Sequence, residues 1–127
     1  MKDFPSIDEV NKMLDEIAEE IPKPIYKGLN GGIVLLPDER EHPRSKNGSL
    51  FILGQYRRDI TGRMVEIYYG SFKKVFWNLR GEALKEKLRE TLHHELTHHL
   101  ESMAGDIDLE VQDEIDMCHY VEMNYAE

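Results

Sequence analysis

The chain of 127 residues has the length of one domain, and its apolar fraction of 40% and charged fraction of 32% are ordinary for a globular protein. A formal net charge of −9 repels phosphate backbones and anionic lipids, so we expect neither nucleic acid nor a membrane as a partner. With a single cysteine, Cys118, and no apolar run of signal-peptide or membrane-span length, a cytoplasmic protein is expected.

The first third of the chain predicts a helix and then a strand. Ser6 and Glu9 form a capping-box pattern, and apolar residues recur at helical spacing over residues 6–20 until Pro22. The turn sequence Asn30-Gly31-Gly32 precedes the short apolar run of residues 33–36, which predicts a strand. The polar residues that follow, 37–49, predict an exposed loop.

Two segments rich in β-branched and aromatic residues predict a β-hairpin. They are Leu50 to Tyr56 and Met64 to Tyr69, and the residues between them contain Thr61-Gly62, where the chain can turn. Beyond Gly70 the apolar spacing becomes helical, and Ser71 is a suitable N-cap for a short second helix.

The last third predicts two further helices. Residues 82–105 contain no internal proline or glycine, and a leucine occupies every fourth position from Leu84 to Leu100. After Gly105, Asp106 or Asp108 can cap a C-terminal helix. The predicted apolar face of that helix consists of Val111, Ile115, Cys118 and Val121.

The long helix carries one HExxH motif, formed by His94, Glu95 and His98. The spacing of four residues places the two histidines one turn apart on one helix face, so both rings can bind a single metal ion, and the leucine row lies on another face. The motif predicts one zinc ion. Glu95, about 100° around the helix, is predicted to act as general base, taking a proton from the attacking water and giving it to the leaving amine.

A catalytic zinc usually has three protein ligands and a water, so one more donor is needed. Four residues could provide it: Glu101, Asp106, Asp108 and His119. The residues alone do not choose among them, since Glu101 could equally support a ligand and each aspartate could equally be a helix cap. The neighbouring His93 and His99 are predicted to be supporting or surface residues, although His99 could contact substrate in a wide cleft.

The HExxH helix, the glycine turn after it, the strand pair and the Asn-Gly-Gly turn resemble the small zincin-like metallopeptidase family of bacteria, whose signature is of the type HExxHHxGxxD. The resemblance implies that Asp108, three residues after Gly105, completes a site with His94 and His98. This chain departs from the pattern because Glu101-Ser102-Met103-Ala104 delays the glycine by four residues, about one helical turn.

The resemblance also implies that an extended peptide binds antiparallel to an edge strand beside the active helix, and Met64 to Tyr69 is the strand predicted for this role. The residues that could stabilise the oxyanion are Tyr68, Tyr69, Tyr120 and His119. The sequence does not choose among them.

These patterns together predict a single α+β zincin-like domain over residues 1–127. Its small mixed three-stranded sheet would pack against the N-terminal helix and the HExxH helix, with the C-terminal helix closing the site. The predicted function is zinc-dependent hydrolysis of peptide bonds in a peptide or protein substrate. Two alternatives remain open: a non-catalytic interaction module with a structural metal, and a metal-dependent hydrolase of non-peptide amides or esters.

Overall fold

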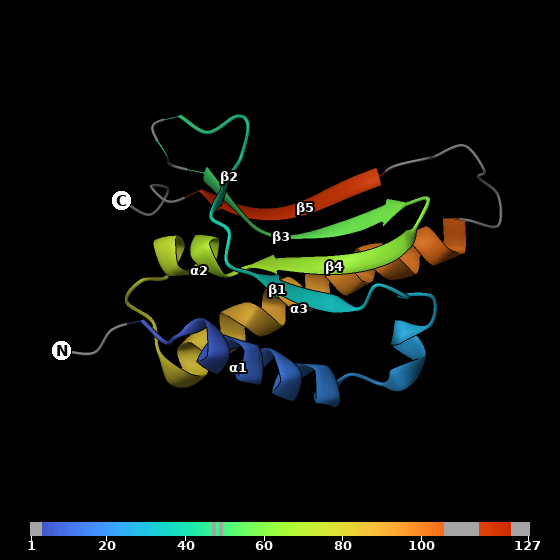
Figure 1. Cartoon of the computed structure of the whole chain (residues 1–127), viewed down its shortest axis with the longest axis horizontal. Helices are drawn as coiled ribbons and strands as arrows, with labels where there is room; N and C mark the ends of the chain where they lie inside the picture. The colour runs from blue at the N-terminus through green and yellow to red at the C-terminus, as the bar shows by residue number, and fades with distance from the viewer. Residues whose placement is uncertain (1–3, 47, 49, 106–114, 123–127) are drawn as a thin grey trace.

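The computed structural model describes residues 4–46, 48, 50–105 and, as a backbone course, 115–122. It has a mixed α+β fold, which confirms the predicted class. The elements in chain order are α1 (Ile7–Glu20), the 3-10 helix η1 (Lys23–Tyr26), β1 (Ile33–Leu36), β2 (Arg40–Glu41), β3 (Leu50–Asp59), β4 (Gly62–Tyr68), α2 (Tyr69–Val75), α3 (Gly81–Gly105) and β5 (Ile115–Glu122) (Figure 1).

The strands form one mixed sheet in which β3 has neighbours along both edges. β4 is antiparallel to β3 on one side and parallel to β1 on its other side. β5 pairs antiparallel with β3 from Leu50 to Arg58. The residues of β3 that pair with β2 and with β4 lie within this same range. β5 therefore occupies one edge of β3, and β2 and β4 both lie along the other edge. The predicted three-stranded sheet is therefore too small, since β2 and β5 extend it.

The first predicted helix is confirmed with its cap. The Ser6 hydroxyl accepts from the Glu9 backbone N–H at 3.2 Å, and the Glu9 carboxylate accepts from the Ser6 backbone N–H at 2.8 Å, which completes the capping box. Val10, Leu14 and Ile17 are buried on one side of α1. They pack in a single core with the leucines of α3 and the inner residues of β3 and β4.

The predicted hairpin is also confirmed, and both strands are longer than predicted. β3 extends to Asp59 and β4 begins at Gly62, so only Ile60 and Thr61 turn the chain. The predicted Asn-Gly-Gly turn packs on the same end of the hairpin: Asn30 Oδ1 accepts from the Arg63 backbone N–H at 2.9 Å. A Cβ atom on Gly31 would lie 2.7 Å from Met64 Cβ, so this close approach requires glycine.

The second helix begins earlier than predicted, and Ser71 is not its cap. α2 starts at Tyr69, and the buried Ser71 hydroxyl instead accepts from the backbone N–H of Arg40 at 2.9 Å. This contact holds the chain where Arg40 pairs with Ile52, and β2 forms within the predicted loop. The sequence did not predict this because the two partners are 31 residues apart.

The predicted C-terminal helix is wrong over residues 115–122, which form β5. In this segment Ile115, Met117 and Val121 alternate with Asp116, Tyr120 and Glu122, which is the strand period, although Cys118 and His119 interrupt the pattern. β3 offers an edge with which such a strand can pair. Asp106, Asp108 and Val111 lie outside the described residues. In the part of the chain that the structure describes, no helix has both the length and the apolar character of a membrane span.

Candidate metal centre

The predicted long helix is confirmed as α3, and its leucine row faces the core. Leu84, Leu88 and Leu92 are fully buried, Leu96 is 3% exposed, and only Leu100, near the C-terminal end, is 44% exposed. The helix contacts β3, β4 and β5 of the sheet. His94 is exposed and His98 is half-buried, so both histidines lie at the margin of the core face, as their spacing predicted.

The side chains of His94 and His98 converge on one point. Their ring centroids are 4.6 Å apart, their planes are nearly perpendicular, and the two Nε2 atoms lie 3.1 Å apart. Two imidazoles that bind one tetrahedral zinc at about 2.05 Å would have their nitrogens about 3.3 Å apart. In this structure the two Nε2 atoms share a hydrogen bond, and their spacing also fits a shared zinc ion.

Glu101 supports His98 from the far side of its ring. The Glu101 carboxylate lies 3.4 Å from His98 Nδ1, and since a carboxylate only accepts, Nδ1 carries the proton. The lone pair of His98 Nε2 then points toward His94, which is the tautomer that a metal ligand needs. In this position the Glu101 carboxylate faces Nδ1 of His98, on the other side of the ring from Nε2.

The electrostatics around the pair favour a neutral His94 ring. Burial, and then the neighbouring His98, lower the pKa of the His94 imidazole below its usual range. Metal binding requires the neutral ring, so a lowered pKa keeps His94 ready to bind a metal at mildly acidic pH.

Glu95 lies next to the histidine pair but inside the fold. Its side chain is fully buried on the face of α3 that packs against the sheet, whereas His94, one residue earlier, is exposed. Carboxylates are rarely buried this completely. The predicted general base is thus excluded from bulk water.

His99 is a core residue, which corrects the prediction of a surface or substrate-contacting side chain. It is fully buried; its Nε2–H donates to the Lys27 carbonyl at 2.8 Å, and its Nδ1 accepts from the Tyr56 hydroxyl at 2.9 Å. Burial lowers the pKa of the His99 ring, which agrees with this neutral tautomer. The two bonds connect α3 to β3 and to the residue that follows η1. Both partners are far from His99 in the sequence, so the HExxH motif could not predict them.

Among the described side chains, no three histidine, cysteine, aspartate or glutamate residues come together as a metal site. Two of the predicted third ligands, Asp106 and Asp108, lie outside the described residues, so Asp108 remains a prediction. His119 belongs to β5, where its backbone pairs with Gly54 of β3.

Two of the predicted oxyanion donors are engaged elsewhere. The buried Tyr68 hydroxyl donates to Glu66 Oε1 at 2.7 Å, and burial, with this bond, raises the pKa of Tyr68. The Tyr69 hydroxyl donates to the carbonyl of Pro5 at 2.6 Å. Tyr120 and His119, the remaining two predicted donors, are both on β5.

The strand predicted to bind substrate is not at an edge of the sheet. Val65 to Tyr68 of β4 pair with β1, and the same strand pairs with β3 along its other side. Both sets of backbone hydrogen-bonding groups are therefore used, and a substrate strand cannot add to β4. The prediction failed because the four-residue β1 occupies the edge that was expected to be free.

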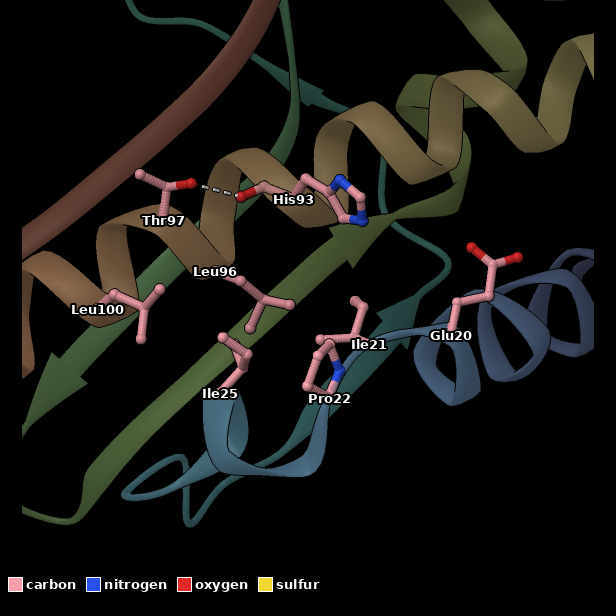
Figure 2. Close-up of a pocket in the computed structure, with 8 residues that line it drawn as sticks. All are labelled: Glu20, Ile21, Pro22, Ile25, His93, Leu96, Thr97 and Leu100. Atoms are coloured by element: carbon pink, nitrogen blue, oxygen red, sulfur yellow. Dashed lines mark hydrogen bonds between the residues drawn. The ribbon is translucent and has the colours of Figure 1, made fainter.

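A groove of about 300 Å³ lies on a different side of α3 from the histidine pair. Figure 2 shows its apolar floor, formed by Ile21, Ile25 and Leu96, with His93 and Glu20 at the rim. His94 and His98 do not line it. The groove is therefore separate from the candidate metal centre.

Fold and site together define an α+β protein with an HExxH helix packed against a mixed sheet. No family model and no curated protein matches the chain. A solved structure, of a conserved hypothetical protein from Thermus thermophilus, is similar: it is 29% identical, with a TM-score of 0.65, and the match covers 80% of this chain and 99% of that chain. The similarity supports the α+β fold, and the neighbour's name specifies no activity.

Proposed function

We propose that this chain is a zinc-dependent metallopeptidase of the zincin-like type. The observation that carries the proposal is the convergence of the His94 and His98 Nε2 atoms, 3.1 Å apart, on the helix that also buries Glu95. Zinc held there by these two residues, with Asp108 as the predicted third ligand, would supply a Lewis acid that acidifies water and polarises a carbonyl.

Each side chain then has a defined task. Glu95 takes a proton from the attacking water and delivers it to the leaving amine, and its burial removes competing solvent. Glu101 holds His98 in the tautomer that presents Nε2 to the metal. Amide hydrolysis needs both a strong nucleophile and protonation of a poor leaving group, and this arrangement can provide both.

The test measures bound zinc and cleavage of a mixed-sequence peptide library by mass spectrometry. The wild-type chain should bind one zinc and cleave peptides, and Glu95→Gln should keep the zinc while cleavage falls by about 10²- to 10⁴-fold. Glu90→Gln is the matched control, because Glu90 is an exposed glutamate of the same helix. Full cleavage by zinc-loaded Glu95→Gln would refute the assigned base, and a wild-type chain without zinc would refute the proposal.

The same experiment distinguishes the proposed metallopeptidase from the non-catalytic alternative, an interaction module with a structural metal. A structural zinc has four protein ligands and no water, so it would stabilise the fold without cleaving any peptide. Zinc binding without cleavage of any library member would favour that alternative. Cleavage of esters or non-peptide amides alone would favour the other hydrolase class.

A further inference from the structure

The surface formed by α2 and the turn that follows it carries positive charge in a strongly acidic chain. Residues 67–81 contain Lys73, Lys74 and Arg80 and no carboxylate, although aspartate and glutamate make up 25 of the 127 residues. Lys73 and Lys74 are both exposed, and neither forms an ion pair with another residue that the structure describes. Figure 1 shows α2 at the end of the sheet opposite the turn between β3 and β4. This end of the molecule therefore presents two ammonium groups to an anionic partner.

Trp77, the one tryptophan of the chain, is exposed next to these lysines. It is 65% exposed, whereas most tryptophans in folded proteins are well covered. With Gly70, Lys73 and Lys74 it lines an open hollow of about 590 Å³, to which Glu39 also contributes. A large exposed aromatic side chain that borders a hollow is a typical anchor for a partner protein.

The backbone that carries Trp77 is fixed, although its indole is exposed. Arg80 Nη1 donates to the carbonyls of Trp77 and Leu79, at 2.9 and 2.8 Å. On the N-terminal side, the Phe76 backbone N–H donates to the Phe72 carbonyl at 2.8 Å, and Phe72 is fully buried. Binding at this surface would therefore require little ordering of the protein.

The charges favour an acidic peptide segment as the partner. Carboxylates complement the two ammonium groups at short range, and an apolar side chain of the same segment can pack against the indole. A nucleic acid or an anionic membrane presents many phosphates, which the net charge of −9 and the Glu39 carboxylate in the hollow would repel. A short acidic segment meets less of this repulsion, because it extends little beyond the two lysines.

The same surface continues onto the face of α3 that carries the histidine pair. Phe76 precedes Trp77 in the chain, and its ring centroid lies 5.8 Å from Lys87 Nζ of α3. Lys87 and His94 are seven residues apart, which places them on one side of the helix and about 10 Å apart along its axis. An extended peptide covers that distance with about three residues. A segment bound at Trp77 can therefore continue toward the candidate metal centre.

We infer that Lys73, Lys74 and Trp77 bind an acidic peptide segment that carries an apolar side chain, and that this segment belongs to the substrate. The binding surface itself does not depend on zinc. Its role in selecting substrates rests on the proposed function. The substrates would then be acidic peptides or proteins that are held at α2 while a neighbouring bond reaches the metal centre.

The test measures binding of a fluorescently labelled synthetic peptide to the metal-free full chain. In this peptide glutamates surround a central leucine, and it is compared with peptides that have glutamine for glutamate or serine for leucine. The acidic peptide should bind, more weakly as salt is added, and should change the emission of Trp77, since the chain has no other tryptophan. Both comparison peptides should bind more weakly, the glutamine peptide by about 10-fold.

Variants locate the bound peptide on the protein. Lys73→Gln/Lys74→Gln should weaken binding of the acidic peptide by about 10-fold, and Trp77→Ala by a similar factor. Lys23→Gln/Lys27→Gln is the matched control, because it removes the same charge from two exposed lysines in and beside η1. Lys73→Glu/Lys74→Glu should reverse the preference, so that a peptide with lysine for glutamate binds better. No binding by the wild type, or equal weakening in the control, would overturn the inference.

The same titration with an oligothymidylate and with phosphatidylserine vesicles tests the two disfavoured partners. Tighter binding of either one than of the acidic peptide, lost in Lys73→Gln/Lys74→Gln, would overturn the inference in favour of that partner.

Cleavage by the zinc-loaded chain separates this inference from the proposed function. Lys73→Gln/Lys74→Gln should raise KM for acidic peptides and leave kcat unchanged. Peptide binding without any cleavage would overturn the proposed function and leave the binding surface in place. Cleavage that shows no preference for acidic peptides would overturn the role of this surface in selecting substrates.

Discussion

His99 shows how one residue can fix the orientation of the whole HExxH helix. Its two ring nitrogens have opposite roles, since one donates to the Lys27 carbonyl and the other accepts from the Tyr56 hydroxyl. Both bonds are made by the residue that follows His98, so they limit rotation of α3 about its axis. The exposure of the histidine pair and the burial of Glu95 depend on that rotation.

Replacing His99 by leucine should destabilise the protein by about 2 to 4 kcal/mol, because the buried Tyr56 hydroxyl and the Lys27 carbonyl both lose their partner. Urea unfolding in the presence of EDTA measures the free energy without a contribution from zinc. Adding Tyr56→Phe should lower the unfolding free energy less in the His99→Leu background than in the wild type, because the Tyr56 hydroxyl has already lost its partner there. An equal loss of unfolding free energy in both backgrounds would contradict the hydrogen bond between Tyr56 and His99. As a control, His93→Leu at an exposed position should change the unfolding free energy by less than about 0.5 kcal/mol.

At the scale of elements, two ion pairs attach α1 to α3. Glu16 accepts from Lys85, and the Glu20 carboxylate binds Arg89 through both of its oxygens. The hydrogen bond from Lys85 lowers the pKa of Glu16, and the bonds from Arg89 lower the pKa of Glu20. A carboxyl group whose pKa is lower in the folded state stabilises the fold above its unfolded pKa, about 4.3, and loses this effect as the pH falls through the lowered value.

The variant Glu16→Gln/Glu20→Gln should therefore be less stable than the wild type at pH 7, and the difference should shrink as the pH falls below about 4. Unfolding free energies measured from about pH 7 to about pH 2.5 provide the comparison. The difference at pH 7 should also fall in high salt, because both carboxylates are exposed. Asp15→Asn, an exposed change on the same helix, is the control, and a difference that persists unchanged at low pH would exclude this mechanism.

The elements that could be predicted from sequence are those whose determinants are local. The capping box of α1, the leucine row of α3 and the two-residue turn of the hairpin each lie within a few residues of what they specify. β2 and β5 depend instead on partners far away in the chain, Ser71 for β2 and β3 for β5. Within the candidate site, the spacing of His94 and His98 correctly predicted that their rings lie together, whereas the metal itself stays a prediction. The core position of His99 depends on Tyr56, 43 residues earlier in the chain.

At the scale of the whole molecule, zinc should act as a stabilising ligand. A ligand that binds only the folded state adds about 2.7 kcal/mol when its concentration is 100 times its Kd. For a chain of this length that corresponds to a rise in Tm on the order of 10 °C. Calorimetry with and without EDTA should show this shift in the wild type and in His93→Ala, and no shift in His94→Ala; an equal shift in His94→Ala would place the zinc elsewhere.

The placement of β5 also has a consequence for how the chain folds during synthesis. Leu50 of β3 pairs with Glu122 of β5, so one edge of β3 gains its neighbour only after the whole HExxH helix has been made. Until then, the apolar segment Phe51-Ile52-Leu53 lies on an open strand edge, which is a template for pairing with other nascent chains. The last strand therefore also completes the protection of the newly made protein against aggregation.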